Sequence, residues 1–254
     1  MRGGHGKLLF KSPRESGRLV QIFAYRDFSL YVFKGGRGDS FKLRGGDEER
    51  LLFPLTGEVD LDGEHLGTRD MAYIPPGEGT NVSLKAPADV YIASASSSSA
   101  ARRFVKRFRG ARVVESGLDN YRRTITVMID VEDKAERFLA GYTEGEPGAW
   151  TSYPPHRHDN KPEAYIFYGM GKGFGVQLIL DEEREAAYIV RDHDVVLIDR
   201  GYHPNVGTTL AGIKYAWIIV APAGERDLSV NIHPEFASVP LPTTHLKITP
   251  SRQG

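Results

Sequence analysis

The chain has 254 residues, enough for one large domain or two modest ones, and its 40% hydrophobic and 26% charged residues are typical of a globular protein. Its 33 basic residues balance 33 acidic residues, so net charge provides no general attraction to nucleic acid or to an anionic membrane. The absence of cysteine excludes disulfides, thiolate metal sites and a cysteine nucleophile. Residues 8–10 are too short an apolar run for a signal-peptide core, and 215–223 are too few to span a bilayer. We therefore expect a cytoplasmic protein without a membrane partner.

Most of the chain is predicted to form short strands. Segments rich in β-branched and aromatic residues occur at 21–25, 29–33 and 124–129, and glycine, proline and aspartate separate such segments. The 28 glycines and 15 prolines suit a β protein with many turns. A short helix is compatible with residues 133–139, but no segment has long helical periodicity. The predicted class is mainly β, as a barrel or a sandwich.

The middle of the chain contains a change in composition. A serine-rich tract at 94–101 is followed by a basic run, RRFVKRFRGAR, at 102–112. We interpret the tract as an exposed connector, which predicts an N-terminal barrel in residues 1–100 and a C-terminal barrel in residues 101–254. In a neutral protein the basic run fits a solvated face or an inter-domain contact better than a nucleic-acid site, so no nucleic-acid partner is expected.

The two halves share a sequence pattern. The segments DMAYIPPG, from Asp70, and DVVLIDRG, from Asp194, each begin with aspartate and have isoleucine four positions later and glycine seven positions later. Upstream, Gly57 and Gly169 each close a hydrophobic strand. This agreement predicts two copies of one β unit.

The second copy contains the stretch YPPHRHDNKPEAY at 153–165. Residues two apart in a strand point to the same face, so His156 and His158 can present their imidazoles side by side. The loop to Glu163 is short enough for this carboxylate to return to the same pocket, and His203 ends the strand that Asp194 opens. Three neutral imidazoles and one carboxylate suit a single divalent ion, with zinc expected first and iron, manganese, nickel or cobalt as alternatives.

Each of these histidines alone would be read as an ordinary surface or core residue, but together they form a specific pattern. An HxHxxxxE motif is followed by a histidine forty residues after the acid, in a matching β repeat. The first half has no histidine after Pro75-Pro76-Gly77, so we expect the metal site only in the second half. The other histidines lack such neighbours and are interpreted as structural: His5, His65, His193, His233 and His245.

The metal motif and the two-copy layout resemble the cupins, specifically a bicupin. Three flanking segments, at 148–159, 173–177 and 201–204, resemble the 5-deoxy-glucuronate isomerase (IolB-like) family of myo-inositol catabolism, which is related to 4-deoxy-5-hexulose-uronate isomerases. The resemblance extends to Arg109-Gly110 and to Asn120–Arg123. It implies two tandem double-stranded β-helix (jelly-roll-like) barrels. It also implies that His156, His158, Glu163 and His203 are the metal ligands.

On the same resemblance the protein would convert a sugar acid between its aldose and ketose forms, 5-deoxy-D-glucuronate to 5-dehydro-2-deoxy-D-gluconate. The chain departs from the family in having Arg157 between the two histidines, Ala164 after Glu163, and Ala216-Trp217 after Tyr215. These changes fall in or near the pocket, so they bear on the identity of the substrate more than on the fold or the metal.

Isomerisation moves a proton between C1 and C2 through an enediol, and it requires a base unless a hydride shifts directly. Candidates for the base are Tyr153, Tyr168 and Tyr202, or Glu163 after release from the metal. The substrate carboxylate requires a cation, for which we favour Lys161 and Arg200, and Gln177 is a candidate to bind a sugar hydroxyl.

Three other functions remain open. The same ligand set serves metal-cupin dioxygenases and epimerases, a different uronate could be the substrate, and a saturated metal site would indicate a non-enzymatic sugar-binding module. Because sheet edges often pair across a two-fold axis, we expect a homodimer.

Overall fold

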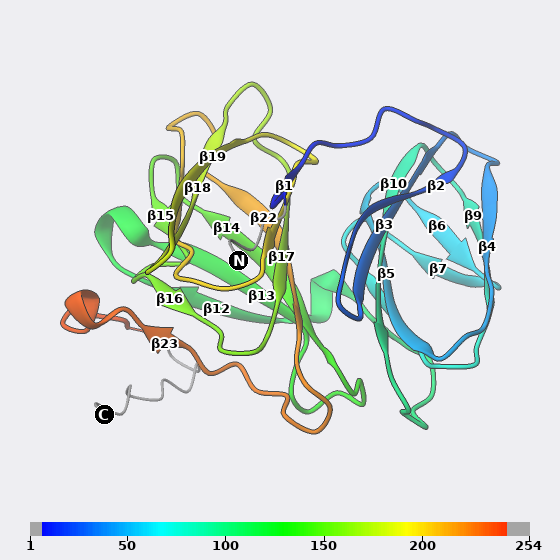
Figure 1. Ribbon diagram of the computed structural model, residues 1–254. Coiled ribbons are helices and arrows are strands. Elements are labelled where there is room, and N and C mark those ends of the chain that lie inside the picture. The colour runs from blue at the N-terminus through cyan, green and yellow to red at the C-terminus, as the bar shows by residue number, and fades with distance from the viewer. Residues whose placement is uncertain (1–6, 243–254) are drawn as a thin grey trace.

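The computed structural model describes residues 7–242, which form two lobes built almost entirely from antiparallel strands (Figure 1). The prediction of a mainly β protein is confirmed. The described helices are single 3-10 turns at Phe108–Gly110, Asp119–Tyr121 and Pro234–Phe236. Within residues 7–242, no helix is both long enough and apolar enough to cross a membrane.

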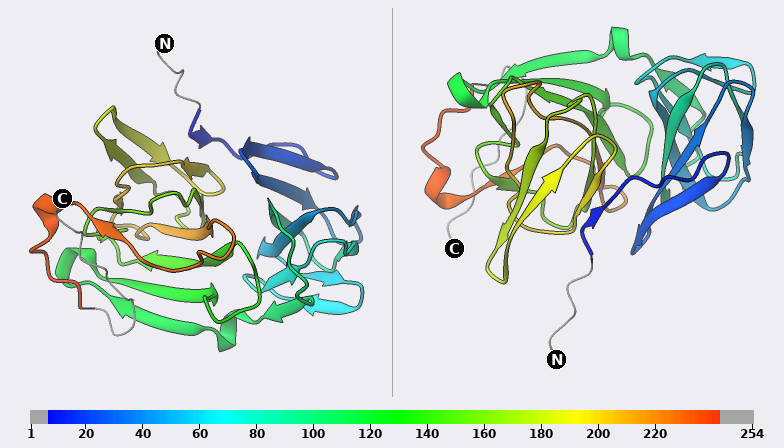
Figure 2. Two further views of the ribbon diagram at one scale, coloured as in Figure 1. Left: turned by 60° about the horizontal axis from the view of Figure 1, so that its bottom comes forward. Right: turned by 90° about the horizontal axis from the view of Figure 1, so that it is seen from above.

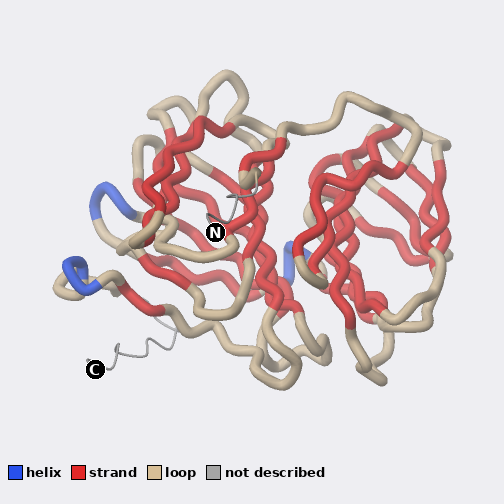
Figure 3. The backbone as a smooth tube through the Cα atoms, viewed as in Figure 1, coloured by secondary structure: helices blue, strands red, loops and turns tan. Residues whose placement is uncertain are grey.

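The first lobe contains a six-stranded sheet and a four-stranded sheet. The larger has the order β11 (Phe104–Lys106), β8 (Met71–Ile74), β5 (Glu48–Thr56), β10 (Ala88–Ser96), β3 (Phe28–Gly35) and β2 (Leu19–Tyr25). The smaller has the order β4 (Ser40–Leu43), β9 (Thr80–Leu84), β6 (Val59–Leu61) and β7 (Glu64–Leu66). Figure 3 shows how little of this lobe lies outside strands and their connecting turns.

The second lobe repeats this plan and adds a two-stranded ribbon. Its large sheet has the order β1 (Leu9–Phe10), β20 (Val195–Ile198), β17 (Glu163–Phe167), β22 (Lys214–Val220), β14 (Phe138–Gly145), β13 (Arg123–Ile129) and β12 (Arg112–Ser116). A four-stranded sheet has the order β15 (Trp150–Thr151), β21 (Asn205–Gly207), β18 (Gly175–Asp181) and β19 (Arg184–Val190). A two-stranded ribbon pairs β16 (His156–Arg157) with β23 (Asn231–Ile232).

Three hydrophobic cores hold these sheets together. One lies within each lobe, and the third contains residues from both large sheets, including Phe53 and Tyr73 of the first lobe and Phe138 and Ile166 of the second. The two views in Figure 2 show the lobes side by side along these sheets. The inner strand β5 is therefore buried on both faces, which explains why it reads as a nearly continuous apolar run rather than as an alternating one.

The sequence repeat corresponds to equivalent turns in the two lobes. Asp70 accepts a hydrogen bond from the Gly67 amide at 3.0 Å, and Asp194 accepts one from the Arg191 amide at 2.9 Å, each three residues before the aspartate. The strand that follows each turn, β8 or β20, pairs with β5 or β17 respectively. The four glycines of the pattern all have positive φ: Gly57, Gly77, Gly169 and Gly201. Their spacing therefore marks turns that favour glycine.

Sheet pairing crosses the predicted division at residue 100 in both directions. β1 lies before the first lobe in sequence but pairs with β20 of the second, whereas β11 lies after residue 100 but pairs with β8 of the first. The tract at 94–101 is not wholly an exposed connector, because its first residues belong to β10 and Ser94 is 1% exposed. The division into domains at residue 100 stays a prediction.

The basic run between the lobes is paired with acids. Arg103 contacts Asp62 at 3.1 Å, Lys106 contacts Asp133 at 2.7 Å, and Arg112 contacts Asp130 at 2.6 Å. The first of these pairs lies with the first lobe, and the others reach the second. The run therefore contributes to contacts within and between the lobes.

The short helix considered at residues 133–139 does not form; turns lead directly into β14 at Phe138. Backbone amides of this segment donate instead to Glu49, whose side chain is fully buried in β5. This carboxylate accepts hydrogen bonds from the amides of Glu136, Arg137 and Phe138 at 2.9, 2.7 and 3.2 Å. Tyr73 also donates to it at 2.9 Å. A tertiary contact thus replaces the bonds of a helix and ties the second lobe to the first.

We predict that Glu49→Gln lowers the free energy of unfolding by at least about 2 kcal/mol, because an amide cannot accept from three backbone donors at once. Urea unfolding followed by circular dichroism measures the effect. Glu48→Gln is the matched control: Glu48 is half-exposed beside Arg50 and should change stability by less than about 0.5 kcal/mol. Equal stabilities of the two variants would contradict this role of Glu49.

Candidate metal centre

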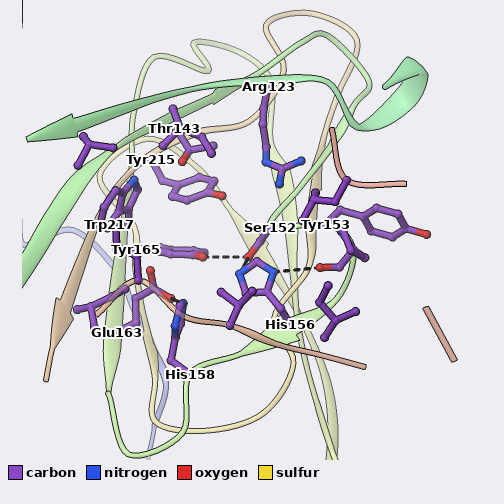
Figure 4. Close-up of a pocket in the computed structure, with 18 residues that line it drawn as sticks. Arg123, Thr143, Ser152, Tyr153, His156, His158, Glu163, Tyr165, Tyr215 and Trp217 are labelled. Carbon is purple, nitrogen blue, oxygen red and sulfur yellow. Dashed lines mark hydrogen bonds and ion pairs between the residues drawn. The ribbon is translucent and has the colours of Figure 1, made fainter. Parts of the chain in front are cut away.

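The site lies in a pocket of the second lobe, over one face of its large sheet (Figure 4). Alternate residues of four neighbouring strands point into it, because side chains two apart share a face of a strand. These are Arg123, Ile125 and Val127 of β13, Thr143 of β14, Tyr215, Trp217 and Ile219 of β22, and Glu163 and Tyr165 of β17. Residues 228–232 and the β16 ribbon close the opposite side, largely with aliphatic side chains.

Small residues on β14 leave room for the pocket. Gly141 pairs with Val127 on one side and Trp217 on the other. A Cβ atom at this position would come within 2.5 Å of Trp217 Cζ2. Glycine at 141 therefore lets the indole lie against the strand.

The three predicted histidines meet at one end of this pocket. Each of His156, His158 and His203 offers a ring nitrogen, and the three nitrogens lie within 4.8 Å of one another. His156 is held by the pairing of β16 with Ile232 of β23, and the His203 amide donates to the His156 carbonyl at 3.3 Å. The chain thus brings together histidines that are 47 positions apart.

Each of the three imidazoles is oriented by a backbone carbonyl. The Nδ1 atoms lie 3.0 Å from carbonyl oxygens, that of Pro154 for His156, Ser229 for His158 and Gly201 for His203. A carbonyl can only accept, so each Nδ1 carries a proton, and in a neutral ring the lone pair is then on Nε2. This is the arrangement in which an outer hydrogen bond prepares a histidine to bind a metal.

The surroundings of His156 and His158 also lower the pKa of both rings. Burial lowers the pKa of His156 well below 6.5, and the neighbouring His203 and His158 add to the effect. Burial likewise lowers the pKa of His158, although the Glu163 carboxylate opposes it. Both shifts favour the unprotonated rings that a metal requires.

Glu163 completes the cluster and lacks a hydrogen-bonding partner of its own. Its Oε2 lies 3.2 Å from His203 Nε2 and 3.8 Å from His158 Nε2. Both Glu163 Oε2 and His203 Nε2 are buried without a hydrogen bond among residues 7–242. A carboxylate oxygen and an imidazole lone pair that face each other as two acceptors are costly unless a cation lies between them. The residues present therefore fit a divalent metal ion.

Two hydroxyl-bearing residues beside the cluster were not anticipated. Tyr165 lies two residues after Glu163 on the same face of β17, and its hydroxyl lies 3.0 Å from Ser152 Oγ. Ser152 Oγ lies 3.4 Å from His156 Nε2. Burial raises the pKa of Tyr165 well above 10, so this phenol keeps its proton and can donate a hydrogen bond. Period-two counting from Glu163 would have found Tyr165.

Arg123 was also missed, although it belongs to a segment on which the family resemblance rests. Its side chain is 5% exposed and points into the pocket from the opposite end of the sheet to Glu163 (Figure 4). Burial lowers the pKa of this guanidinium, and no carboxylate is among the causes. The sequence signal was a polar residue at the start of an otherwise apolar strand.

The three tyrosines proposed as bases lie in different surroundings. Tyr153 borders the pocket, but Figure 4 shows its ring turned away from the imidazoles, and it packs against Tyr121 and Trp150. Tyr168 comes five residues after Glu163, an odd separation, and its side chain lies on the opposite face, in the core between the lobes. There its hydroxyl donates to Glu144 at 3.2 Å. Tyr202 packs against His233 outside the pocket lining.

The three residues proposed to bind substrate already have partners elsewhere. Lys161 pairs with Asp227 at 2.7 Å. Arg200 pairs with Asp181 at 3.3 Å and borders a second cavity. Gln177 is fully buried behind His203, where its Nε2 donates to the His203 carbonyl at 2.8 Å. None of the three lines the metal pocket.

The remaining described histidines lie away from the cluster. His65 is exposed on β7, His193 contacts Asp89 at 3.2 Å, and the His233 side chain caps the last 3-10 turn. His5 and His245 fall outside the described residues.

A model of the KduI/IolB family matches residues 17–239. The chain belongs to the KduI/IolB family. This confirms the resemblance inferred from the sequence motifs.

Among curated relatives, a 5-deoxy-glucuronate isomerase of Geobacillus kaustophilus is 28% identical over 229 residues, covering 76% of this chain and 80% of the relative. A 4-deoxy-L-threo-5-hexosulose-uronate ketol-isomerase of Rhizobium meliloti is 28% identical over 170 residues, covering 63% of this chain and 60% of the relative.

Solved structures show the same fold. An IolB-like protein of Salmonella typhimurium superposes with a TM-score of 0.80 at 19% identity, covering 92% of this chain and 99% of that one. The Bacillus subtilis oxalate decarboxylase, whose Mn(II) centres have been studied, superposes with a TM-score of 0.63 at 11% identity, covering 89% and 79%. The predicted cupin fold is therefore confirmed.

We predict that His203→Gln weakens divalent-metal binding at least about tenfold, because it removes a lone pair from the centre of the cluster. Zinc titration of chelator-treated protein measures the affinity. The control is His65→Gln, a change on the exposed surface of the first lobe. Unchanged zinc affinity in a folded His203→Gln protein would show that His203 is not a ligand.

Proposed function

We propose that this protein is a metal-dependent sugar-acid isomerase that interconverts an aldose and a ketose. The observation that supports it most is the convergence of three imidazole Nε2 atoms and Glu163 at one end of a pocket with apolar walls. Family membership and the names of the relatives support the reaction class. The reaction needs no co-reactant, since the proton lost at one carbon is matched by a proton gained at its neighbour.

The proposed ligands are His156, His158, Glu163 and His203. We propose one ion, zinc first, with manganese, iron, nickel or cobalt as alternatives, since imidazole and carboxylate suit all of them. When bound, the ion would supply a Lewis acid that stabilises negative charge on the oxygens of the enediol.

The protein's own residues would prepare the substrate around this site. The Tyr165 and Ser152 hydroxyls lie beside His156 and can donate hydrogen bonds to sugar oxygens. Trp217, Ile219 and residues 228–232 exclude water from the other walls, which strengthens the electrostatic interactions inside. Of the three tyrosines proposed as bases, only Tyr153 borders this space. Tyr153 and Glu163 are therefore the two candidates for the general base.

We propose 5-deoxy-D-glucuronate as the substrate and 5-dehydro-2-deoxy-D-gluconate as the product, following the relative with the greater coverage. The second candidate is the 4-deoxy-5-hexulose uronate, for which other relatives are named. It ranks second because those relatives match a shorter part of the chain.

Incubating metal-loaded protein with each uronate and following the aldehyde signal by NMR tests this proposal. We expect 5-deoxy-glucuronate to be converted, the conversion to stop after chelation, and an added divalent ion to restore it. If the metal-loaded protein converts neither uronate, the proposed function is wrong.

We also propose a homodimer. The outermost strand of the large sheet of the second lobe, β12, has an exposed edge, and its Val113 is 56% exposed. Such an edge can pair with a second copy across a two-fold axis. Light scattering should give twice the mass of one chain, and the mass of a single chain would contradict the proposal. The cytoplasmic location stays a prediction that cell fractionation would test.

A further inference from the structure

Arg123 occupies the end of the pocket opposite to the metal cluster. It opens β13, where it pairs with Gly145 of β14. Glu163, in contrast, pairs with Ile219 near the other end of β22. Tyr215 and Trp217 of β22 line the pocket between these two levels. The pocket therefore has two polar ends with an aromatic wall between them (Figure 4).

The guanidinium of Arg123 is buried without an anion. Its recorded hydrogen bond runs from Nη1 to the Tyr121 carbonyl at 3.1 Å. Within residues 7–242 no carboxylate lies within 4.0 Å of it, although other arginines and lysines in the same part of the chain form such ion pairs, for example Arg137 with Asp27 at 2.7 Å and Arg184 with Asp199 at 2.8 Å. An arginine that is 5% exposed and points into a cavity with unused donors is costly for the folded protein. Such a cost is expected where the missing partner is a ligand.

We propose that Arg123 binds the carboxylate of the substrate and so determines the preference for sugar acids. The inference rests on the proposed function for the identity of the ligand. A planar guanidinium presents paired donors that match the two oxygens of a carboxylate. With the carboxylate at Arg123, the opposite end of the sugar, which carries the carbonyl, lies toward the histidine cluster. Arg123 would therefore fix the direction of the substrate in the pocket.

This assignment replaces Lys161 and Arg200 as the proposed carboxylate partners. Lys161 and Arg200 each contact acidic side chains already, and neither lines the pocket. Arg123, in contrast, lines the pocket and has no acidic partner in the described chain.

The test measures equilibrium binding of 5-deoxy-D-glucuronate and of its C6 amide by calorimetry, with zinc-loaded protein. The wild type should bind the acid about 10- to 100-fold more tightly than the amide, as expected for a charge-assisted pair. Arg123→Met should lose most of this preference, and Arg123→Lys should keep part of it. Arg122→Met is the matched control, because Arg122 is the exposed neighbour in sequence and should behave as wild type.

Two further readouts separate a ligand contact from a structural one. Arg123→Met should keep its zinc content and should not lower the urea midpoint, because it removes an unpaired buried charge. If Arg123→Met discriminates acid from amide as well as the wild type, or if the wild type does not discriminate, the proposal is overturned. A wild type that prefers the acid but does not isomerise it would refute the proposed function and leave the role of Arg123 intact.

Discussion

Alternation along β17 is the constraint on which the rest of the structure depends. One face of this strand sends Ala164 and Ile166 into the core that joins the lobes, and the other sends Glu163 and Tyr165 into the pocket. A shift of one residue in register would exchange the two sets. The pairings of β17 with both β20 and β22 fix the register, so the same hydrogen bonds that build the sheet also place the carboxylate among the histidines.

The histidine cluster is prepared by its backbone rather than by other side chains. Three carbonyls hold the three Nδ1 atoms at 3.0 Å, and these carbonyls come from the turn before β16, from the bend between β20 and β21 and from the segment before β23. The result is a cluster of three imidazoles whose Nε2 atoms are left free of these backbone contacts, two of them beside the buried Glu163 carboxylate. At the opposite end, Arg123 supplies the opposite kind of group, a cation that donates to the Tyr121 carbonyl and has no acidic partner among residues 7–242. The proposed sugar-acid substrate has an oxygen-rich carbonyl end and an anionic end, and we propose that the two ends of the pocket bind them.

The sequence predicted much of the fold and the centre of the site because both depend on local rules. Period-two spacing placed His156 and His158 together, and the repeat of aspartate and glycine identified equivalent turns in the two lobes. What the sequence did not predict depends on long-range contacts. Glu49 removes a helix from residues 133–139 by accepting their amides from 87 or more positions away. Lys161 and Arg200 form ion pairs with acidic residues from other segments, whereas Arg123 has no acidic partner among residues 7–242. No local sequence pattern distinguishes these three cations.

The central claim is that the four side chains share one divalent ion and leave room for a ligand. Anomalous diffraction from a zinc-soaked crystal, collected on both sides of the zinc absorption edge, tests it most directly. We expect a single strong peak bounded by Nε2 of His156, His158 and His203 and by the Glu163 carboxylate. An absent peak at this cluster, or an ion that binds the Nδ1 atoms instead, would contradict it.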